Sequence, residues 1–414
     1  MTVQDDMIHR DSDLFKNLPT LARTAVDVIS PDELRDKLSS NRQLRIKYGV
    51  DVTAPFLHIG HAVNLWAMRE LQDAGHKVIF LIGDFTTRIG DPTGKSKTRP
   101  QLSRDQIEQD AEEFIQQAKT ILRSDQELFE VRRNSEWWDA MPLSRFMELI
   151  SLCTHAKLVQ RDMFQKRIEE NVEIRMHELL YPILQGYDSY ELESDLTIVG
   201  TDQVFNEIMG RFYQERLGAS AQVVITTEIT RGTDGRAKQS KSLGNYIGLG
   251  DSPRDIYGKA MRLKDELVVE FLRAYTFVPL AEIAEIERQM DSGTLNPMRA
   301  KQLLGRELVQ RYHGSATALE EEQWFSNVFS EHSVPEDIPE VDVPDPNATL
   351  IDILRTCLPN ESGNEIRRLI RQGGVTAAGD TKLTDPELRH PVSSGDVIRV
   401  GKRRWFRILF NQDG

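Results

Sequence analysis

The chain has few of the features that mark secreted, fibrous or membrane proteins. Only two of its 414 residues are cysteine, too few for a disulfide framework or a cysteine zinc site, and this fits a reducing cytoplasm. No apolar run approaches the ~20 residues that a membrane-spanning helix needs, so we expect no membrane partner. The first residues lack the basic and apolar segments of a secretory signal. With 26 glycines and 17 prolines, the chain is neither collagen-like nor broadly disordered.

Positive charge is also in short supply, but it is unevenly distributed. The chain has 52 Lys and Arg against 65 Asp and Glu, a net charge of −13, which argues against a protein that binds a polyanion over its whole surface. Residues 349–414 nevertheless carry eleven basic and eight acidic residues, a net of +3, which leaves −16 on the preceding 348. This asymmetry predicts a separate C-terminal domain with its own partner.

A boundary signal precedes that domain. Residues 331–348 contain four prolines and six acidic residues but no Lys or Arg, a composition typical of a stiff linker, because proline blocks regular structure and like charges extend the chain. Helical periodicity predicts a small helical domain at 251–330. We therefore expect a domain at 1–250, a helical domain at 251–330, the linker, and a domain at 349–414.

Strand and helix patterns alternate within the first domain. The strand-like runs are 43–50, 77–82, 196–199 and 222–226, and a helical pattern such as 62–74 lies between them. This alternation predicts an α/β fold with a Rossmann-like, doubly wound parallel sheet. Residues 102–192 look mostly helical and are too long for one crossover, so we expect them to form an insertion.

Polar clusters stand where these strands end, and ligands of open α/β sheets bind at that edge. Asp51 directly follows the first strand, and His58-Ile59-Gly60-His61 opens the next helix. A helix N-terminus offers free amide donors to phosphate, and two imidazoles three residues apart can face one oxyanion. Gly60 has no side chain to keep a nucleotide from the backbone. The cluster predicts a nucleotide phosphate site.

A second basic cluster, Lys238-Gln239-Ser240-Lys241-Ser242, follows the last strand of the domain. Lysines three apart in a loop can close on a triphosphate and neutralise the charge of departing pyrophosphate. Such a pattern by itself is most often solvated surface charge.

Together the two clusters resemble the His-Ile-Gly-His and Lys-Met-Ser-Lys-Ser signatures of class I aminoacyl-tRNA synthetases. Three further segments, 83–95, 180–188 and 200–203, are similar to the tyrosyl-tRNA synthetase family of bacterial type, and the resemblance runs from about residue 30 to the C-terminus. It implies ATP-dependent activation of L-tyrosine to tyrosyl-adenylate and transfer to tRNA-Tyr. It also implies an anticodon-stem-binding helical domain, a small α+β RNA-binding domain like one in a ribosomal protein, and a homodimer formed through the 102–192 insertion.

The resemblance also implies roles for individual residues. Those expected to act on the phosphates are His58, Thr53, Lys238, Lys241, Lys95 and Arg99, and His61 is expected on the ribose side of ATP. Those expected to contact the rest of ATP are Gly60, Asp202 and Ser240, and Gln203 is expected near the reacting carboxylate and the α-phosphate. Mg²⁺ is expected to arrive with ATP, because we find no dedicated carboxylate cluster that would hold a metal.

Tyrosine binding is expected from a polar stripe on one helix. Tyr181, Gln185 and Asp188 stand at i, i+4 and i+7 and so share a helix face. By resemblance, Asp188 accepts the phenol proton. The full set expected to bind the amino acid is Tyr181, Gln185, Asp188, Asp91, Thr86 and Asp51, and the set expected to bind RNA is Arg367, Arg368, Arg371, Lys402 and Arg403.

The chain departs from the family pattern close to the expected site. Val52 replaces a proline, Thr87-Arg88 a Gly-Met pair, Val199 a glycine and Gln239 a methionine, and Lys47 or Tyr48 stands where many members place a tyrosine. These changes fit a divergent tyrosine enzyme. They also fit a paralogue that activates a tyrosine-like amino acid or uses another acceptor than tRNA. A catalytically silent RNA-binding protein is a third reading, but it conflicts with the intact histidines, lysines and tyrosine triad.

Overall fold

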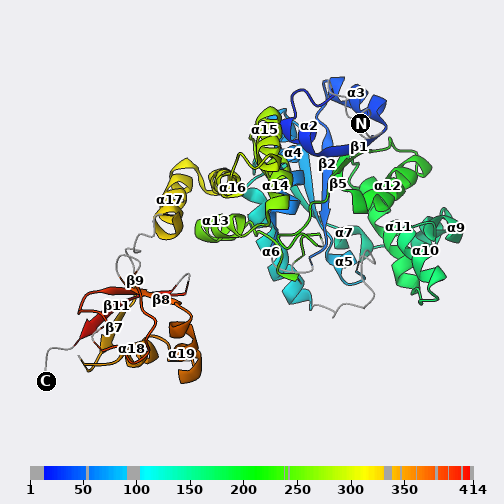
Figure 1. Cartoon of the computed structure of the whole chain (residues 1–414). Coiled ribbons are helices and arrows are strands. Elements are labelled where there is room, and N and C mark those ends of the chain that lie inside the picture. The colour runs from blue at the N-terminus through cyan, green and yellow to red at the C-terminus, as the bar shows by residue number, and fades with distance from the viewer. Residues whose placement is uncertain are drawn as a thin grey trace. The chain divides into compact units, whose positions relative to one another are not determined.

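The computed structural model forms two compact units, Met1–Leu319 and Glu320–Gly414 (Figure 1). The residues it describes are 14–52, 56–90, 103–236, 238–240, 243–330, 338–345, 347–359, 361–377, 381–389, 391–401 and 404–410. The expected four-part division stays a prediction.

A six-stranded sheet forms the centre of the first unit, in the order β1-β6-β5-β2-β3-β4. The strands are β1 (Ala25–Ile29), β2 (Arg45–Val50), β3 (Lys77–Ile82), β4 (Phe129–Arg133), β5 (Leu196–Gly200) and β6 (Val223–Thr227). The strands β6, β5, β2, β3 and β4 are parallel, and β1 pairs antiparallel with β6 at the edge. The predicted Rossmann-like parallel sheet is therefore confirmed.

The central strands are those that the sequence predicts, because strands covered on both faces are nearly continuous apolar runs. β3, KVIFLI, is buried along almost its whole length. The two edge strands were not expected. β4 reads FEVRR and is only partly buried, since an edge strand needs no continuous apolar run. Because β4 lies inside 102–192, that segment is not wholly an insertion: its first part is another crossover of the sheet.

Helices surround this sheet (Figure 1). They are α2 (Pro19–Thr24), α3 (Pro31–Ser39), α4 (Ile59–Asp73), α5 (Asp84–Thr87), α6 (Arg104–Lys119), α7 (Ser135–Trp138), α8 (Leu143–Ser151), α9 (His155–Leu158), α10 (Asp162–Glu169), α11 (Met176–Glu191), the 3₁₀ turn η1 (Thr201–Gln203) and α12 (Val204–Arg216). Two glycines let α11 and α12 approach closely. A Cβ on Gly186 would lie 2.9 Å from the Met209 backbone, and one on Gly210 would lie 2.6 Å from the Ser189 hydroxyl.

A helical region follows the sheet, as its periodicity predicts. It contains α13 (Pro253–Met261), the turn η3 (Asp265–Leu267), α14 (Val268–Tyr275), α15 (Leu280–Asp291), α16 (Pro297–His313), α17 (Ser315–Phe325) and the π-helical turn η4 (Ser326–Ser330). Gly305 of α16 lies against the Tyr257 ring of α13, where a Cβ would come within 3.0 Å.

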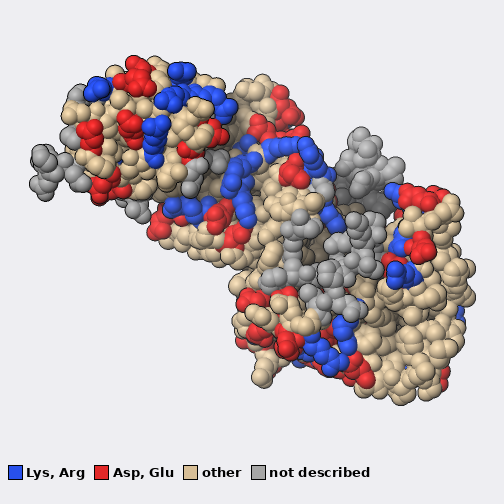
Figure 2. Space-filling model, turned by 90° about the horizontal axis from the view of Figure 1, so that it is seen from below, with Lys and Arg blue, Asp and Glu red and all other residues tan. Residues whose placement is uncertain are grey.

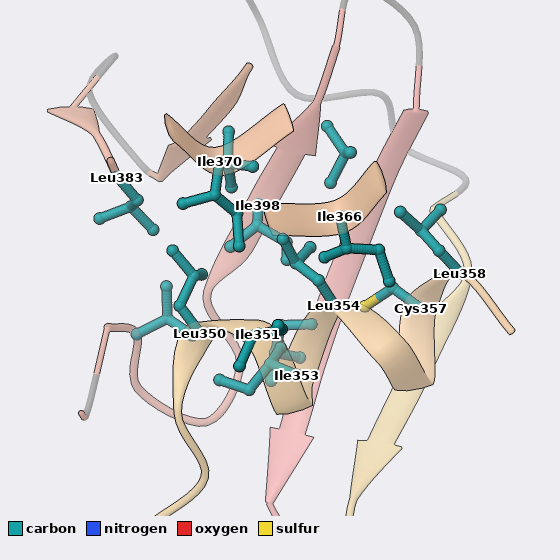
Figure 3. Close-up of a cluster of buried hydrophobic side chains, with 14 of the residues drawn as sticks. Leu350, Ile351, Ile353, Leu354, Cys357, Leu358, Ile366, Ile370, Leu383 and Ile398 are labelled. Carbon is teal, nitrogen blue, oxygen red and sulfur yellow. The ribbon is translucent and has the colours of Figure 1, made fainter. Parts of the chain in front are cut away.

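The C-terminal unit is an α+β structure. Its sheet has the order β7-β11-β10-β8-β9. After the end of α17 and η4, its elements are β7 (Glu340–Val343), α18 (Leu350–Cys357), α19 (Gly363–Arg371), β8 (Val375–Ala377), β9 (Thr381–Lys382), β10 (Val397–Val400) and β11 (Arg404–Phe410). Buried side chains of both helices and the sheet, including Leu354, Ile366, Ile370 and Ile398, form its core (Figure 3).

One stretch of the expected linker belongs to this sheet instead. Residues 340–343 form β7, which pairs in parallel with β11. Val341 and Val343 alternate with acidic residues, so one face of the strand is apolar while the other stays charged. An edge strand tolerates this charge, which composition alone does not distinguish from a linker.

The close approach of α11 and α12 predicts the effect of filling it. Gly186→Ala should destabilise the first unit by ~1–3 kcal/mol, because the new methyl group meets backbone atoms that cannot move aside. Urea unfolding followed by tryptophan fluorescence measures this change. Gly258→Ala is the control: this α13 glycine has no atom closer than 3.9 Å to the added Cβ, so alanine should be neutral or stabilising by up to ~1 kcal/mol. Equal effects of the two substitutions would contradict the tight packing.

Candidate active site

The histidine cluster begins helix α4. His58 is the N-cap residue, and its Nδ1 accepts a hydrogen bond from the backbone N–H of Gly60 at 3.2 Å. The His58 backbone N–H in turn donates to Nδ1 of His61 at 3.2 Å, and the two rings are 3.9 Å apart between centroids. Both imidazoles are thus held at the N-terminus of α4, the end that carries the partial positive charge of the helix dipole. A Cβ on Gly60 would lie 2.9 Å from the His58 ring, so a larger residue here would displace that imidazole.

The chain that follows the lysine cluster runs beside this turn. The backbone N–H of Ile59 donates to the carbonyl of Ile247 at 2.9 Å, and the rings of Phe56 and Tyr246 stack at 5.2 Å. Gln239 comes within 3.8 Å of the position of a Cβ on Gly60. The two signature clusters, nearly 180 residues apart in the sequence, therefore meet at one edge of the sheet.

The lysine cluster also reaches the end of β5. Lys238 Nζ forms an ion pair with Asp202 Oδ2 at 2.7 Å, and the Lys238 side chain is still half-exposed. The Ser240 backbone N–H donates to Asn245 Oδ1 at 2.8 Å, which helps to fix the loop. The structure thus joins a residue expected to act on phosphate to one expected to contact the ribose.

Gln239, which replaces the family's methionine, fixes the loop to the helical region. Its side-chain amide is buried and donates to the hydroxyl of Tyr275 at 2.6 Å and to that of Thr230 at 3.2 Å. Burial raises the pKa of the Tyr275 phenol well above its usual range, so this hydroxyl stays neutral. A polar residue is therefore accommodated here because α14 supplies a polar partner.

Asp51, at the end of β2, connects two elements on the amino-acid side of the site. Its Oδ2 accepts from the Tyr181 hydroxyl of α11 at 2.8 Å, and its Oδ1 accepts from the Thr86 hydroxyl of α5 at 2.7 Å. Three residues expected to bind the amino acid therefore form one hydrogen-bonded group. The carboxylate and tyrosine oxygens give this group acceptors suited to an ammonium ion.

Asp188 lies deeper, 2 % exposed, at the other end of the α11 stripe. Its Oδ1 accepts from the indole N–H groups of Trp137 and Trp138 at 2.9 and 2.8 Å, and its Oδ2 accepts from Asn134 at 3.2 Å. Burial raises the pKa of this carboxyl to about 7, although the three donors and the Lys47 charge act in the opposite direction. Because Oδ2 accepts one hydrogen bond among the described residues, from Asn134, it retains capacity to accept a phenol proton.

Asn134, Trp137 and Trp138 were missed by sequence reasoning. They follow β4 and belong to the turn before α7 and to α7 itself. Once a strand at 129–133 is assumed, a polar and aromatic cluster directly after it is the same signal that identified the other clusters. The Asn134 amide also donates to Thr86 at 3.0 Å, so it connects the Asp51 group with Asp188.

The two glutamines of the expected site are joined by a residue that sequence reasoning also missed. Asn206 Nδ2 donates to Gln185 Oε1 at 2.8 Å and to Gln203 Oε1 at 3.0 Å. Gln185 Nε2 donates to Glu207 Oε1 at 2.8 Å. Asn206 and Glu207 both belong to α12, which starts directly after the cluster at the end of β5.

Lys47, not Tyr48, faces these helices. Lys47 Nζ bonds Ser189 of α11 and Glu207 of α12, whereas the Tyr48 ring packs against Phe80 at 5.8 Å. Successive side chains of a strand point to opposite faces of the sheet, so only one of the two can face α11 and α12. An ammonium ion therefore stands where many family members place a phenol.

Two of the other residues that differ from the family pattern, Val52 and Thr87, are hydrogen-bonded to each other. The backbone N–H of Val52, which proline lacks, donates to the Thr87 hydroxyl at 2.8 Å. Arg88 pairs with Asp139 at 2.9 Å outside this group, and Val199 is 8 % exposed within β5. The Val52 and Thr87 substitutions thus keep the Asp51 turn attached to α5.

Several expected site residues lie outside the described residues: Thr53, Asp91, Lys95, Arg99, Lys241, Lys402 and Arg403.

In the C-terminal unit, α19 begins with a capping box, since Ser362 and Glu365 bond each other's backbone amides. Its Ile366 and Ile370 side chains point into the core, while Arg368 and Arg371 are exposed and Arg367 is half-exposed. Basic and acidic side chains are interspersed over the face drawn in Figure 2.

The described residues contain no group of three or more His, Cys, Asp or Glu side chains placed to hold a metal ion. In the same part of the chain, no helix has the length and apolar character required to cross a membrane.

A parallel α/β sheet whose strand ends combine a histidine-capped helix, a lysine loop and a hydrogen-bonded cluster of acidic and amide side chains defines the nucleotide-binding site of a class I synthetase. The family model described as tRNA synthetases class I (W and Y) matches residues 39–330. The chain belongs to this family.

Its relatives are named consistently. The tyrosine–tRNA ligase of Oleidesulfovibrio alaskensis is 44% identical over 403 residues, covering 96% of this chain and 99% of the relative. That of Thermotoga maritima is 41% identical, covering 94% and 96%. Among solved structures, a C-terminally truncated mitochondrial tyrosyl-tRNA synthetase of Aspergillus nidulans has a TM-score of 0.60 at 22% identity, covering 78% of this chain and 99% of that one. At this identity the structural likeness supports the fold.

The raised pKa of Asp188 predicts how stability depends on pH. The folded carboxyl holds its proton up to about pH 7, whereas an unfolded aspartate ionises near ~3.9, so the folded state binds the extra proton between these values. Stability should therefore fall as pH rises through this window, by up to about 1.4 kcal/mol per pH unit, and level off above pH 7. Urea unfolding at pH 5, 6, 7 and 8 measures the slope.

The control for this measurement is Asp188→Asn, which has nearly the same shape and no titrating group. The free energy of unfolding of this variant should lack the pH-dependent contribution of Asp188. The difference in this free energy between wild type and variant should therefore shrink or reverse as pH rises from 5 to 7. A difference that stays constant over this range would contradict the raised pKa.

Proposed function

We propose that the chain activates L-tyrosine with ATP to tyrosyl-adenylate and transfers the tyrosyl group to tRNA-Tyr. The observation that carries this proposal is the meeting of the histidine turn, the Lys238 loop and the α11 stripe at one edge of the sheet. Relatives named tyrosine–tRNA ligase that match nearly the whole chain support the same substrates.

The chemistry requires positioning more than proton transfer. The tyrosine carboxylate is already an anion near neutral pH, so it can attack the α-phosphate of ATP without a general base. Negative charge then moves onto the departing pyrophosphate. The N-terminus of α4 at the His58–His61 turn, with the partial positive charge of its helix dipole, and the Lys238 side chain stabilise this developing charge. Mg²⁺ carried by ATP would supply further charge neutralisation on the phosphates.

Selection of tyrosine rests on Asp188. A phenol that donates to Oδ2 completes the hydrogen bonds of this buried carboxyl, whereas phenylalanine leaves it without that partner. A buried polar group left unpaired costs ~1–3 kcal/mol or more, so phenylalanine should bind poorly. The ammonium group would bind among Asp51, Tyr181 and Gln185.

Transfer to tRNA would engage the rest of the chain. The exposed arginines of α19 suit RNA phosphates, and the helical region is proposed to bind near the anticodon stem. ATP, tyrosine and tRNA-Tyr meet in the cytoplasm, where we propose that the chain acts.

Pyrophosphate exchange with each of the twenty amino acids and with tyrosine analogues tests the proposal. Tyrosine-dependent exchange supports an active synthetase, and its absence would favour the silent RNA-binding protein. Aminoacylation of tRNA-Tyr then separates the proposed enzyme from a paralogue with a different amino acid or acceptor.

The role of Lys238 can be tested separately. Lys238→Ala should lower the exchange rate by tenfold or more while the affinity for tyrosine changes little, because the lysine acts on the phosphates and not on the amino acid. Steady-state exchange together with equilibrium tyrosine binding measures both quantities. Lys264→Ala is a matched control, since both lysine side chains are 53% exposed and carry an acidic partner. Equal loss of exchange and tyrosine binding in Lys238→Ala would argue against this role.

We further propose a homodimer through the 143–184 face. Leu143, Met147 and Met176 are 74%, 53% and 70% exposed. Leu143 lines an apolar pocket of about 260 Å³ together with Leu180 and Trp138, and Met147 and Met176 directly follow or precede two other lining residues, Phe146 and His177. Exposed apolar groups gathered in this way mark interaction surfaces. Because Trp138 also donates to Asp188, association at this face would support the tyrosine site.

The dimer proposal predicts dissociation by charge. Leu143→Glu combined with Met176→Glu should convert a dimer of the chain to a monomer, since two carboxylates per protomer cannot be buried unpaired. Light scattering coupled to size exclusion gives the mass directly. Leu280→Glu on α15 provides the control, because that leucine is 47% exposed and lies outside residues 143–184. A monomeric wild-type chain would contradict the proposal.

A further inference from the structure

The chain buries an ion pair that the proposed reaction does not use directly. Lys47 and Glu207 are 1% and 2% exposed, and Lys47 Nζ lies 2.7 Å from Glu207 Oε2 and 3.0 Å from Oε1. The same ammonium donates to the Ser189 hydroxyl at 2.8 Å, so its three hydrogens all have acceptors. A buried pair of this kind is seldom better for stability than apolar residues of equal volume. Another role is therefore worth seeking in its contacts.

Glu207 accepts two more hydrogen bonds. Gln185 Nε2 donates to Oε1 at 2.8 Å, and Gln222 Nε2 donates to Oε2 at 2.8 Å. With the lysine, these donors fill the four acceptor positions of the carboxylate. A carboxylate can only accept, so it requires the nitrogen end of the Gln185 amide to face it. The oxygen end of Gln185 must then face away from Glu207.

Asn206 hydrogen-bonds Gln185 and a second glutamine, Gln203, and so fixes the orientation of the Gln203 amide as well. Its side chain is fully buried, and its Nδ2 donates to Gln185 Oε1 and to Gln203 Oε1. Its own Oδ1 is buried without a hydrogen-bond partner in the described part of the chain, so the residue acts here as a donor alone. The oxygen end of the Gln203 amide is thereby held towards Asn206, and its nitrogen end faces the opposite way.

We propose that the Lys47–Glu207 pair is a positioning device for the substrate's α-amino-acid group, and this inference rests on the proposed function. Through Asn206 the pair makes Gln185 present an acceptor and Gln203 a donor. An α-amino acid needs this polarity, because its ammonium donates and its carboxylate accepts. Partners within the protein fill the hydrogen-bonding positions of Lys47 and Glu207, so the pair acts on the substrate through the glutamines and consists of positioning residues. The lysine that departs from the family pattern thus sets affinity for the amino acid.

The test removes the charges and keeps the volume. In the full-length chain, Lys47→Met/Glu207→Gln leaves Gln185 facing a neutral amide that can take either orientation. The KM for tyrosine in pyrophosphate exchange should rise about tenfold, which corresponds to ~1.4 kcal/mol, while the KM for ATP stays within about twofold. A tyrosine KM within twofold of wild type in a folded double variant, or an equal rise in both KM values, would overturn the inference.

Asn206→Leu tests the relay with the ion pair intact, and it decides the matter if the double variant does not fold. It should also raise the tyrosine KM about tenfold. Both changes break the same chain of hydrogen bonds. The variant that combines all three substitutions should therefore raise the tyrosine KM about tenfold, whereas independent sites would raise it about a hundredfold. Additive effects, or no effect of Asn206→Leu on the tyrosine KM, would overturn the inference.

Arg167→Met/Glu178→Gln is the matched control for loss of an ion pair. These side chains are 17% and 16% exposed, and Glu178 belongs to the same helix, α11, without bonding either glutamine. Its tyrosine KM should stay within twofold of wild type; a tenfold rise would show that any lost pair on α11 has this effect and would overturn the inference. A wild-type chain without tyrosine-dependent exchange would overturn the proposed function and this inference with it. A wild-type chain that exchanges beside unaffected variants would overturn this inference alone.

Discussion

The end of β2 constrains the whole site, because parallel strands deliver their carboxyl ends to one edge of the sheet. Asp51 stands at that point, held by Tyr181 from α11 and Thr86 from α5. The histidine turn follows it along the chain, and the clusters after β3 and β5 come to the same edge from neighbouring strands. Functional side chains from segments that are far apart in the sequence therefore lie close together at this edge.

Sequence reasoning reached the parts of this arrangement that local pattern encodes. Buried strands such as β3 are apolar runs, and the clusters behind them stand out as polar breaks. It missed β4, whose charges suit a sheet edge, and with it Asn134, Trp137 and Trp138. It also missed the strand in the acidic 340–343 segment. Both failures have one cause: an edge strand needs only a half-apolar pattern, which tertiary pairing completes.

The polar interior of the site was beyond sequence reasoning for a different reason. A lysine in β2 and a glutamate in α12 are ordinary residues until the sheet brings them within 2.7 Å of each other. The same is true of Asn206, whose position next to a signature cluster gave no indication that it joins two glutamines. The effect of a residue that differs from the family pattern can be judged only when the side chains it contacts are known, as the hydrogen bond between Val52 and Thr87 shows.

The central claim is that one cleft holds a nucleotide beside an aromatic amino acid. A crystal structure of the chain with a non-hydrolysable tyrosyl-adenylate analogue tests it most directly. We predict the phenol oxygen at Asp188, the ammonium group among Asp51, Tyr181 and Gln185, and the adenosine between the His58–His61 turn and Asp202. An analogue bound elsewhere, or one whose phenol points away from Asp188, would contradict the account.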